Sequence, residues 1–340
     1  MPGDGSRERA NTRPSDSQLK PLTAFLLAAV VALGALIAVS RGHVDRMAYG
    51  DGLIYRYVAS HLTTPPSQVD QVVSSRGSSI RYGRIGFPAL IWLASAGHNS
   101  AMPYAQAALI VISAGLAGAA TAHLFQRAGP TGALFAFIAP GFSLSVVGGY
   151  GEVMAAALAL WAVILTSRAR YWPAAGLLAV AMLTRENAGA VLIGLMGWEL
   201  LHRRAKGAAL LLTSILPLAA WYVFIHERFN QIPLLDTYLR KTTDTIGTPF
   251  VAVWHSLTRG GAGSIATAAI HLALALVAFW LWRKDILTIV AAAAGLQVLS
   301  SGAFAWHFIG DAMRAFTFLE LFLLLSLLRY RWRELEPATG

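Results

Sequence analysis

The sequence predicts an all-α, polytopic membrane protein, on three observations. Of the 340 residues, 56% are hydrophobic and 13% are Asp, Glu, Lys or Arg, which is about half the charged fraction of a soluble domain. Several uncharged runs, the first at residues 22–39, have about the 20 residues that a bilayer crossing needs. The Lys and Arg residues stand between these runs. Backbone groups in hydrocarbon must be satisfied within their own segment, so the runs should be helices.

The charge pattern predicts how the chain crosses the membrane. The net charge of +10 is spread over loops and does not form one patch, so it indicates membrane topology and no nucleic-acid partner. Short basic loops at 168–170, 203–206, 283–284 and 329–333 should face the cytoplasm.

These loops divide the chain into a single transmembrane domain, residues 20–334, between two cytoplasmic tails, 1–19 and 335–340. The first tail is rich in Ser, Pro, Arg and Asp and should be disordered. About ten transmembrane helices are expected, near 22–40, 104–125, 131–148, 152–167, 172–184, 188–201, 207–225, 261–282, 286–304 and 314–330. Both ends are then cytoplasmic, in a multi-pass protein of the cell membrane.

The same count excludes residues 85–97 as a span, since one more crossing would put Glu152 on the wrong side. These 13 residues should dip into the outer leaflet or lie on it. Two long outer loops result, 41–103 and 226–260. The helices at 152–167, 172–184 and 188–201 are short for a crossing, which favours helix ends inside the membrane around a cavity.

Ionisable residues at membrane depth are costly and by default indicate function. Several that are far apart in the sequence fall on the predicted outer side: Asp51, Glu152, Arg185, Glu186, Asp311 and Arg314. We therefore expect the fold to gather them at one site.

Each acidic candidate has a structural alternative. Asp51 lies between two glycines, which is typical of a turn, but a carboxylate near the membrane surface can also act as a general base towards a hydroxyl. Glu152 follows a glycine-rich stretch at a helix start, where it complements the helix dipole. A helix N-terminus of this kind also binds anions.

The arginines have a similar pair of interpretations. Arg185 and Glu186 neutralise each other, or Arg185 holds a phosphate while Glu186 orients it. Asp311 and Arg314 are one helical turn apart and are expected to pair, with a ligand role as the alternative. Arg81 and Arg84 are candidate phosphate ligands in the first outer loop.

The sequence contains no motif for a cofactor. It has no cysteine and no paired-histidine metal spacing, and it lacks a P-loop, a nucleophile elbow and a dinucleotide fingerprint. No metal or cofactor is therefore predicted, although a divalent metal is not excluded. His307 is the one histidine that we count as a candidate substrate ligand, whereas His123 and His271 are expected to pack between helices.

Four short motifs, in order, resemble those of the GT-C class of polyprenyl-phosphate-sugar-dependent glycosyltransferases, including bacterial membrane mannosyltransferase-like proteins. An acidic motif at 49–55 follows the first helix, and Arg-Tyr-Gly-Arg-Ile-Gly-Phe-Pro stands at 81–88. Gly-Tyr-Gly-Glu at 149–152 is similar to the Tyr-Ser-Glu motif of the GPI mannosyltransferases. Leu-Thr-Arg-Glu-Asn at 183–187 is similar to the Leu-Thr-Arg segment of bacterial relatives. The resemblance covers roughly residues 20–200.

The resemblance implies a GT-C-like helical bundle and an inverting transfer of a hexose such as mannose. The donor would be a polyprenyl-phosphate-linked sugar and the acceptor a glycan or lipid of the cell envelope, on the extracytoplasmic side. Asp51 would be the base and Glu152 would orient a substrate, with Tyr55 and Tyr150 among the substrate contacts. Gly52 stands where many members have a second acidic residue, which argues against a two-carboxylate or metal-assisted version.

Two other functions remain open from the sequence. A transporter or flippase for a lipid-linked or anionic substrate could use the same arginines and carboxylates, but it predicts internal repeats, which we do not see. A non-catalytic assembly subunit would tolerate loss of both Asp51 and Glu152.

Overall fold

The computed structural model describes residues 16–48, 50–62, 82–229, 250–282, 285–301, 306 and 309–334. Over these residues the chain forms helices and no strand, so the all-α expectation is confirmed there. Expectations for residues 1–15, 63–81, 230–249 and 335–340 lie outside the described part, including most of the second outer loop.

The helices follow one another with few interruptions. The α-helices are α1 Asp16–Ser40, α2 Asp51–Ser60, α5 Gly86–Ala94, α6 Met102–Leu124, α7 Pro140–Gly148, α8 Glu152–Ser167, α9 Tyr171–Thr184, α10 Gly189–Leu201, α11 Ala205–Leu212, α12 Ile215–Phe229, α14 Val251–Arg259, α15 Ala262–Leu281, α16 Ile286–Leu299, α17 Ile309–Ala315 and α18 Thr317–Glu334. The 3₁₀ segments are η1 Val44–Arg46, η2 Asn99–Ala101, η3 Gln126–Ile138 and η4 Glu186–Ala188.

Among the described helices, four are long and apolar enough to cross a membrane: Lys20–Ser40, Asn99–Leu124, Ala205–Glu227 and Ala262–Leu281. The bent pair η3 and α7 would make a fifth. Three shorter apolar helices, α8, α9 and α16, correspond to expected spans. The chain therefore has the helices of a membrane protein, while the count of ten crossings stays a prediction.

The core is built around α8 and α16, whose residues are buried over most of their length. Both helices are rich in alanine, and small residues allow helix backbones to approach closely in a membrane protein. Glu152 is the first residue of α8, so one of these two enclosed helices begins with a charge.

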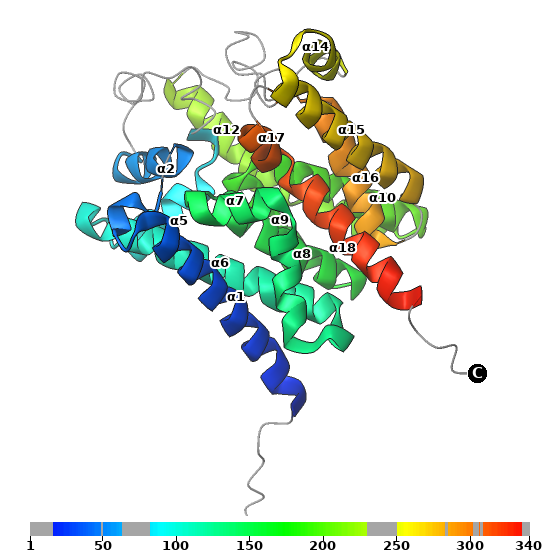
Figure 1. Cartoon of the computed structure of the whole chain (residues 1–340), viewed down its shortest axis with the longest axis horizontal. Coiled ribbons are helices and arrows are strands. Elements are labelled where there is room, and N and C mark those ends of the chain that lie inside the picture. The colour runs from blue at the N-terminus through cyan, green and yellow to red at the C-terminus, as the bar shows by residue number, and fades with distance from the viewer. Residues whose placement is uncertain are drawn as a thin grey trace, which may run out of the picture.

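Two ends of the molecule can be distinguished in Figure 1. Helix α1 begins and α18 ends at the lower end of this view, whereas α2, α12 and α17 lie at the upper end. The start of α1 and the end of α18 thus lie at one end of the described molecule and the candidate site segments at the other; which side of a membrane each end faces stays a prediction.

Three expected helix boundaries were wrong. Residues 131–148 do not form one helix, because η3 and α7 meet at an angle of 81°. Pro140 begins α7, and the preceding Ala139 is extended, as expected for a residue before proline. The last helix does not begin at Arg314, which belongs to the separate helix α17. Residues 16–19 are helical and belong to α1, not to a disordered tail.

The segment excluded as a span is short and helical. Residues 86–94 form α5, which packs against α2, α6 and α9. Its position relative to the outer leaflet stays a prediction.

Candidate functional site

Four charged residues from four separate segments meet at one end of the molecule. Asp51 is the first residue of α2, Glu152 the first residue of α8, Arg185 links α9 to η4, and Arg314 lies in α17. We call Asp51, Glu152, Arg185 and Arg314 the ion cluster. The fold therefore brings Asp51, Glu152 and Arg185 together, as expected.

The ion cluster is a continuous chain of contacts. Arg314 Nη2 lies 2.8 Å from Asp51 Oδ2 and 3.1 Å from Glu152 Oε1. Arg185 Nη2 lies 3.2 Å from the same Glu152 oxygen. Glu152 Oε1 thus faces two guanidinium groups, and Arg314 connects the two carboxylates.

The two carboxylates differ in their access to solvent. The Asp51 side chain is 21% exposed and the Glu152 side chain 1%. Burial of a charge is tolerated when it is paired, and Glu152 has two arginines for this purpose. Asp51 is the carboxylate that an incoming molecule can reach.

Backbone close to Asp51 is held by contacts that only glycine permits. A Cβ on Gly52 would lie 2.6 Å from the carbonyl oxygen of Gly148. Gly149 ends α7 in the left-handed region, with φ of 68°, which glycine adopts without strain. Gln106, buried in α6, donates to the carbonyl oxygens of Gly52 and Gly149 at 3.0 and 2.7 Å. The start of α2 is therefore fastened to the turn that leads into Glu152.

This packing also explains the glycine at position 52. A carboxylate side chain at this position would collide with backbone, so the two-acid version of the motif cannot be built on this local structure.

Two tyrosines border the ion cluster. The guanidinium carbon of Arg314 lies 3.7 Å from the centre of the Tyr150 ring, a cation–π geometry that favours a fixed orientation of the guanidinium. Tyr55 is fully buried and its ring packs edge-on against Phe87. Both residues were expected at the site, and both are near it.

Several buried polar atoms of the ion cluster and of the neighbouring Tyr55 have no hydrogen-bond partner among the described residues. They are Nε and Nη1 of Arg185, Oε2 of Glu152 and the Tyr55 hydroxyl. Buried polar atoms are normally satisfied, and exceptions call for a functional explanation. The Arg185 nitrogens are donors, the Glu152 oxygen is an acceptor and the Tyr55 hydroxyl can be either. This set suits a ligand that carries both hydroxyl groups and oxygen atoms that only accept hydrogen bonds.

No protein-family model, curated protein or solved structure matches the chain. The resemblance to the GT-C class accordingly rests on the sequence motifs alone. What the site does chemically has to be argued from its own geometry.

Arg84 and Glu186 form a second pair beside the ion cluster. Arg84 donates through Nε and Nη2 to the two Glu186 oxygens at 2.9 and 2.6 Å. Burial alone would raise the pKa of the Glu186 carboxyl, but Arg84 outweighs burial and holds this pKa at about 2. The pair therefore stays charged at any pH near neutral.

This pair bears on two expectations about neighbouring residues. The sequence left open whether Glu186 neutralises the adjacent Arg185; in the structure the Glu186 carboxylate, at the start of η4, pairs with Arg84. Arg185 forms an ion pair with Glu152 instead. Arg84 has two donors engaged by Glu186, so Arg185 is the better placed candidate for binding phosphate.

Three expected site residues lie wholly or partly outside the described structure. Arg81 and His307 lie outside the described residues, and so does the side chain of Asp311. The expected pairing of Asp311 with Arg314 stays a prediction, and the partners described for Arg314 are Asp51 and Glu152. Substrate roles for all three stay predictions, as does the absence of a metal.

Two polar features were not anticipated. Gln106 could have been found, since a polar side chain inside an apolar helix is an expected helix–helix contact. Glu320, in α18, accepts from the backbone N–H of Gly141 at 2.7 Å and contacts His271 Nε2 at 3.0 Å. Glu320 thus supports the start of α7, whose other end leads to Glu152, and His271 packs between helices as expected.

Proposed function

We propose that this chain is a membrane glycosyltransferase that moves a hexose, such as mannose, from a polyprenyl-phosphate donor to an acceptor hydroxyl on the extracytoplasmic side. One observation carries the proposal. The accessible carboxylate of Asp51 and the buried carboxylate of Glu152 share Arg314, next to a buried arginine with unused donors. Proton acceptor and anion-binding groups are the two requirements of this reaction.

In the proposed step, the acceptor oxygen attacks the anomeric carbon as Asp51 takes the hydroxyl proton. The bond between that carbon and the phosphate oxygen breaks, and polyprenyl phosphate leaves with the electron pair. Attack from the face opposite the phosphate inverts the anomeric configuration. The leaving phosphate needs no proton, since it is already stabilised as an anion.

The pairing of Asp51 with Arg314 gives this step an electrostatic rationale. The ion cluster and the Arg84–Glu186 pair together contain three arginines and three carboxylates, so their formal charges cancel. When Asp51 becomes protonated, Arg314 loses one of the two anionic partners described for it. At the same moment the leaving phosphate gains a negative charge, so Arg314 and Arg185 can stabilise it where charge develops.

Glu152 is a positioning residue in this proposal. It is buried, and it faces both arginines through one oxygen. Its second oxygen and the Tyr55 hydroxyl are available to hydroxyl groups of the sugar or the acceptor. The polyprenyl tail would lie against the short helices.

The test uses the full chain in proteoliposomes that contain polyprenyl-phosphate mannose and an extract of envelope acceptors. Release of polyprenyl phosphate and formation of mannosylated product are measured together. A general base contributes about 10²- to 10⁴-fold, so we expect Asp51→Asn to lower the rate at least about a hundredfold.

Asp45→Asn is the matched control, because Asp45 is an exposed aspartate on η1, six residues earlier. It should retain the wild-type rate. Full activity in Asp51→Asn would reject the base assignment. Movement of intact donor across the bilayer without release of polyprenyl phosphate would instead identify a transporter.

A further inference from the structure

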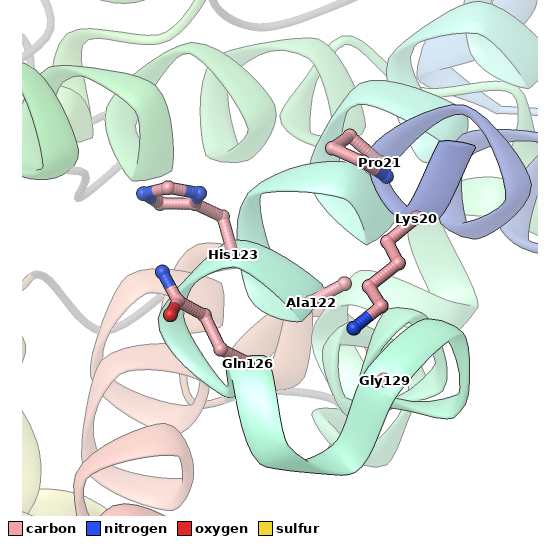
Figure 2. Close-up of a pocket in the computed structure, with 6 residues that line it drawn as sticks. All are labelled: Lys20, Pro21, Ala122, His123, Gln126 and Gly129. Carbon is pink, nitrogen blue, oxygen red and sulfur yellow. The ribbon is translucent and has the colours of Figure 1, made fainter. Parts of the chain in front are cut away.

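A pocket of about 390 Å³ lies between the start of α1 and the end of α6. Figure 2 shows Lys20 and Pro21 from α1 on one side, with Ala122, His123, Gln126 and Gly129 from α6 and η3 around the other. None of the residues lining it belongs to the ion cluster or was a candidate site residue.

The separation of this pocket from the ion cluster can be followed along two helices, α6 and α8. On α6, Gln106 hydrogen-bonds the backbone beside Asp51, whereas His123 lines the pocket. The two residues are 17 positions apart, which corresponds to about 25 Å along the helix axis. Helix α8 repeats this arrangement, with Glu152 at its first residue and Arg168 directly after its last. The pocket is therefore at the opposite end of the bundle.

The side chains around the pocket offer several hydrogen-bond donors. Arg168 Nη2 contacts His123 Nε2, and a guanidinium can only donate. His123 Nε2 must accept, so in the neutral ring Nδ1 carries the proton. Lys20 and the Gln126 amide add further donors, and no acidic residue is among the described residues that line the pocket. This is the chemistry of an anion site.

The pocket adjoins a surface suited to lipid chains. Lys20 begins the apolar segment Lys20–Ser40, and Leu22, Leu26 and Val30 on α1 are 55%, 52% and 66% exposed. Exposed aliphatic side chains on a helix of this kind face hydrocarbon in a bilayer. A lysine at the end of such an apolar segment reaches to the headgroup level.

We propose that this pocket binds the phosphate of one anionic phospholipid, whose acyl chains lie along the exposed face of α1. Lys20 and Arg168 supply positive charge, and His123 and Gln126 supply hydrogen bonds to the phosphate oxygens. Basic pockets between transmembrane helices are suited to such headgroups. In the predicted topology this lipid is in the cytoplasmic leaflet. The proposal does not depend on the proposed glycosyl transfer.

Native mass spectrometry of the detergent-solubilised full chain tests this proposal. Dioctanoyl phosphatidylglycerol, dioctanoyl phosphatidylcholine and inorganic phosphate are added separately. We expect one phosphatidylglycerol per chain to bind more tightly than phosphatidylcholine. A basic residue near anionic lipid contributes about fivefold in affinity, so Lys20→Gln and Arg168→Gln should each weaken phosphatidylglycerol binding by about that factor, whereas Lys20→Arg should retain it.

Lys206→Gln is the matched control. Lys206 is exposed and lies near the start of α11. It is at the same end of the bundle as Arg168, because Tyr171, which begins α9 shortly after Arg168, donates a hydrogen bond to Glu199 near the end of α10. It should bind phosphatidylglycerol as the wild type does. Equal binding of the two lipids would overturn the proposal, as would unchanged affinity in Arg168→Gln, a variant of an exposed loop residue. Displacement of phosphatidylglycerol by an equal concentration of inorganic phosphate would also overturn it.

Discussion

Asp51 and Glu152 carry the same charge in opposite environments. Asp51 is partly exposed and has one arginine partner described, whereas Glu152 is enclosed and faces two. A carboxylate that must accept a proton needs access to its substrate. A carboxylate that orients arginines needs burial and fixed geometry. The exposed fractions of the two side chains therefore distinguish the proposed proton acceptor from the proposed positioning residue better than residue type does.

Tyr55 provides a sharp test at the residue scale. Its buried hydroxyl has no partner among the described residues, so Tyr55→Phe should leave the thermal unfolding midpoint unchanged or slightly raised. If the hydroxyl contacts substrate, sugar transfer should fall about tenfold, which corresponds to the loss of one hydrogen bond of about 1.4 kcal/mol. Both quantities are measured on the same detergent-purified protein.

Tyr82→Phe is the contrasting variant. The Tyr82 hydroxyl donates to the His61 carbonyl oxygen at 2.9 Å, so its loss should cost about 1 kcal/mol of stability and leave transfer unchanged. A Tyr55→Phe protein that is less stable and fully active would show that the hydroxyl is structural.

At the element scale, the site depends on a close approach of backbones. The start of α2 rests on the turn between α7 and α8, and Gln106 from α6 fastens both. The other end of α7 is held by Glu320 from α18. Helix α7 is thus fixed at both ends, which sets where Glu152 begins α8.

Gly52→Ala should disrupt this contact. The added Cβ would lie 2.6 Å from the Gly148 carbonyl oxygen, and overpacking of this kind costs about 1–3 kcal/mol. We expect a lower thermal midpoint in detergent, and lower sugar transfer because Asp51 is displaced.

Gly34→Ala is the control for helix propensity, since a Cβ there meets nothing within 4 Å in α1. It should be neutral or stabilising by up to about 1 kcal/mol. A Gly52→Ala protein as stable as Gly34→Ala would contradict the packing described at the ion cluster.

At the scale of the whole molecule, the ion cluster and the basic pocket lie at opposite ends of α6 and α8. The separation of about 25 Å is comparable with the hydrocarbon thickness of about 30 Å. A bilayer around these helices would place the two features near opposite surfaces. This arrangement is what a bundle with the proposed chemistry on one side of the membrane and the predicted basic loops on the other would have.

Cysteine labelling can test that orientation, because the chain contains no cysteine of its own. Ser100→Cys precedes α6 and Ala205→Cys begins α11, and both positions are exposed. A membrane-impermeant maleimide should label Ser100→Cys in intact cells, whereas Ala205→Cys should react only after the membrane is opened. The reverse pattern would invert the topology and place the ion cluster in the cytoplasm.

The sequence by itself determined the all-α fold and the apolar helices long enough to cross a membrane, since a long apolar run is a local property. It also singled out the candidate charges, which are visible at once beside such runs. Even so, the bend at Pro140 was missed, although the restriction that proline places on Ala139 is also local. The tertiary structure alone decided which charges meet. Arg314 contacts Asp51 across 263 positions and Arg84 contacts Glu186 across 102, whereas Arg185 is adjacent to Glu186 and contacts Glu152. Ion pairs form between groups that are close in three dimensions, and the order of residues in the chain does not specify which groups these are.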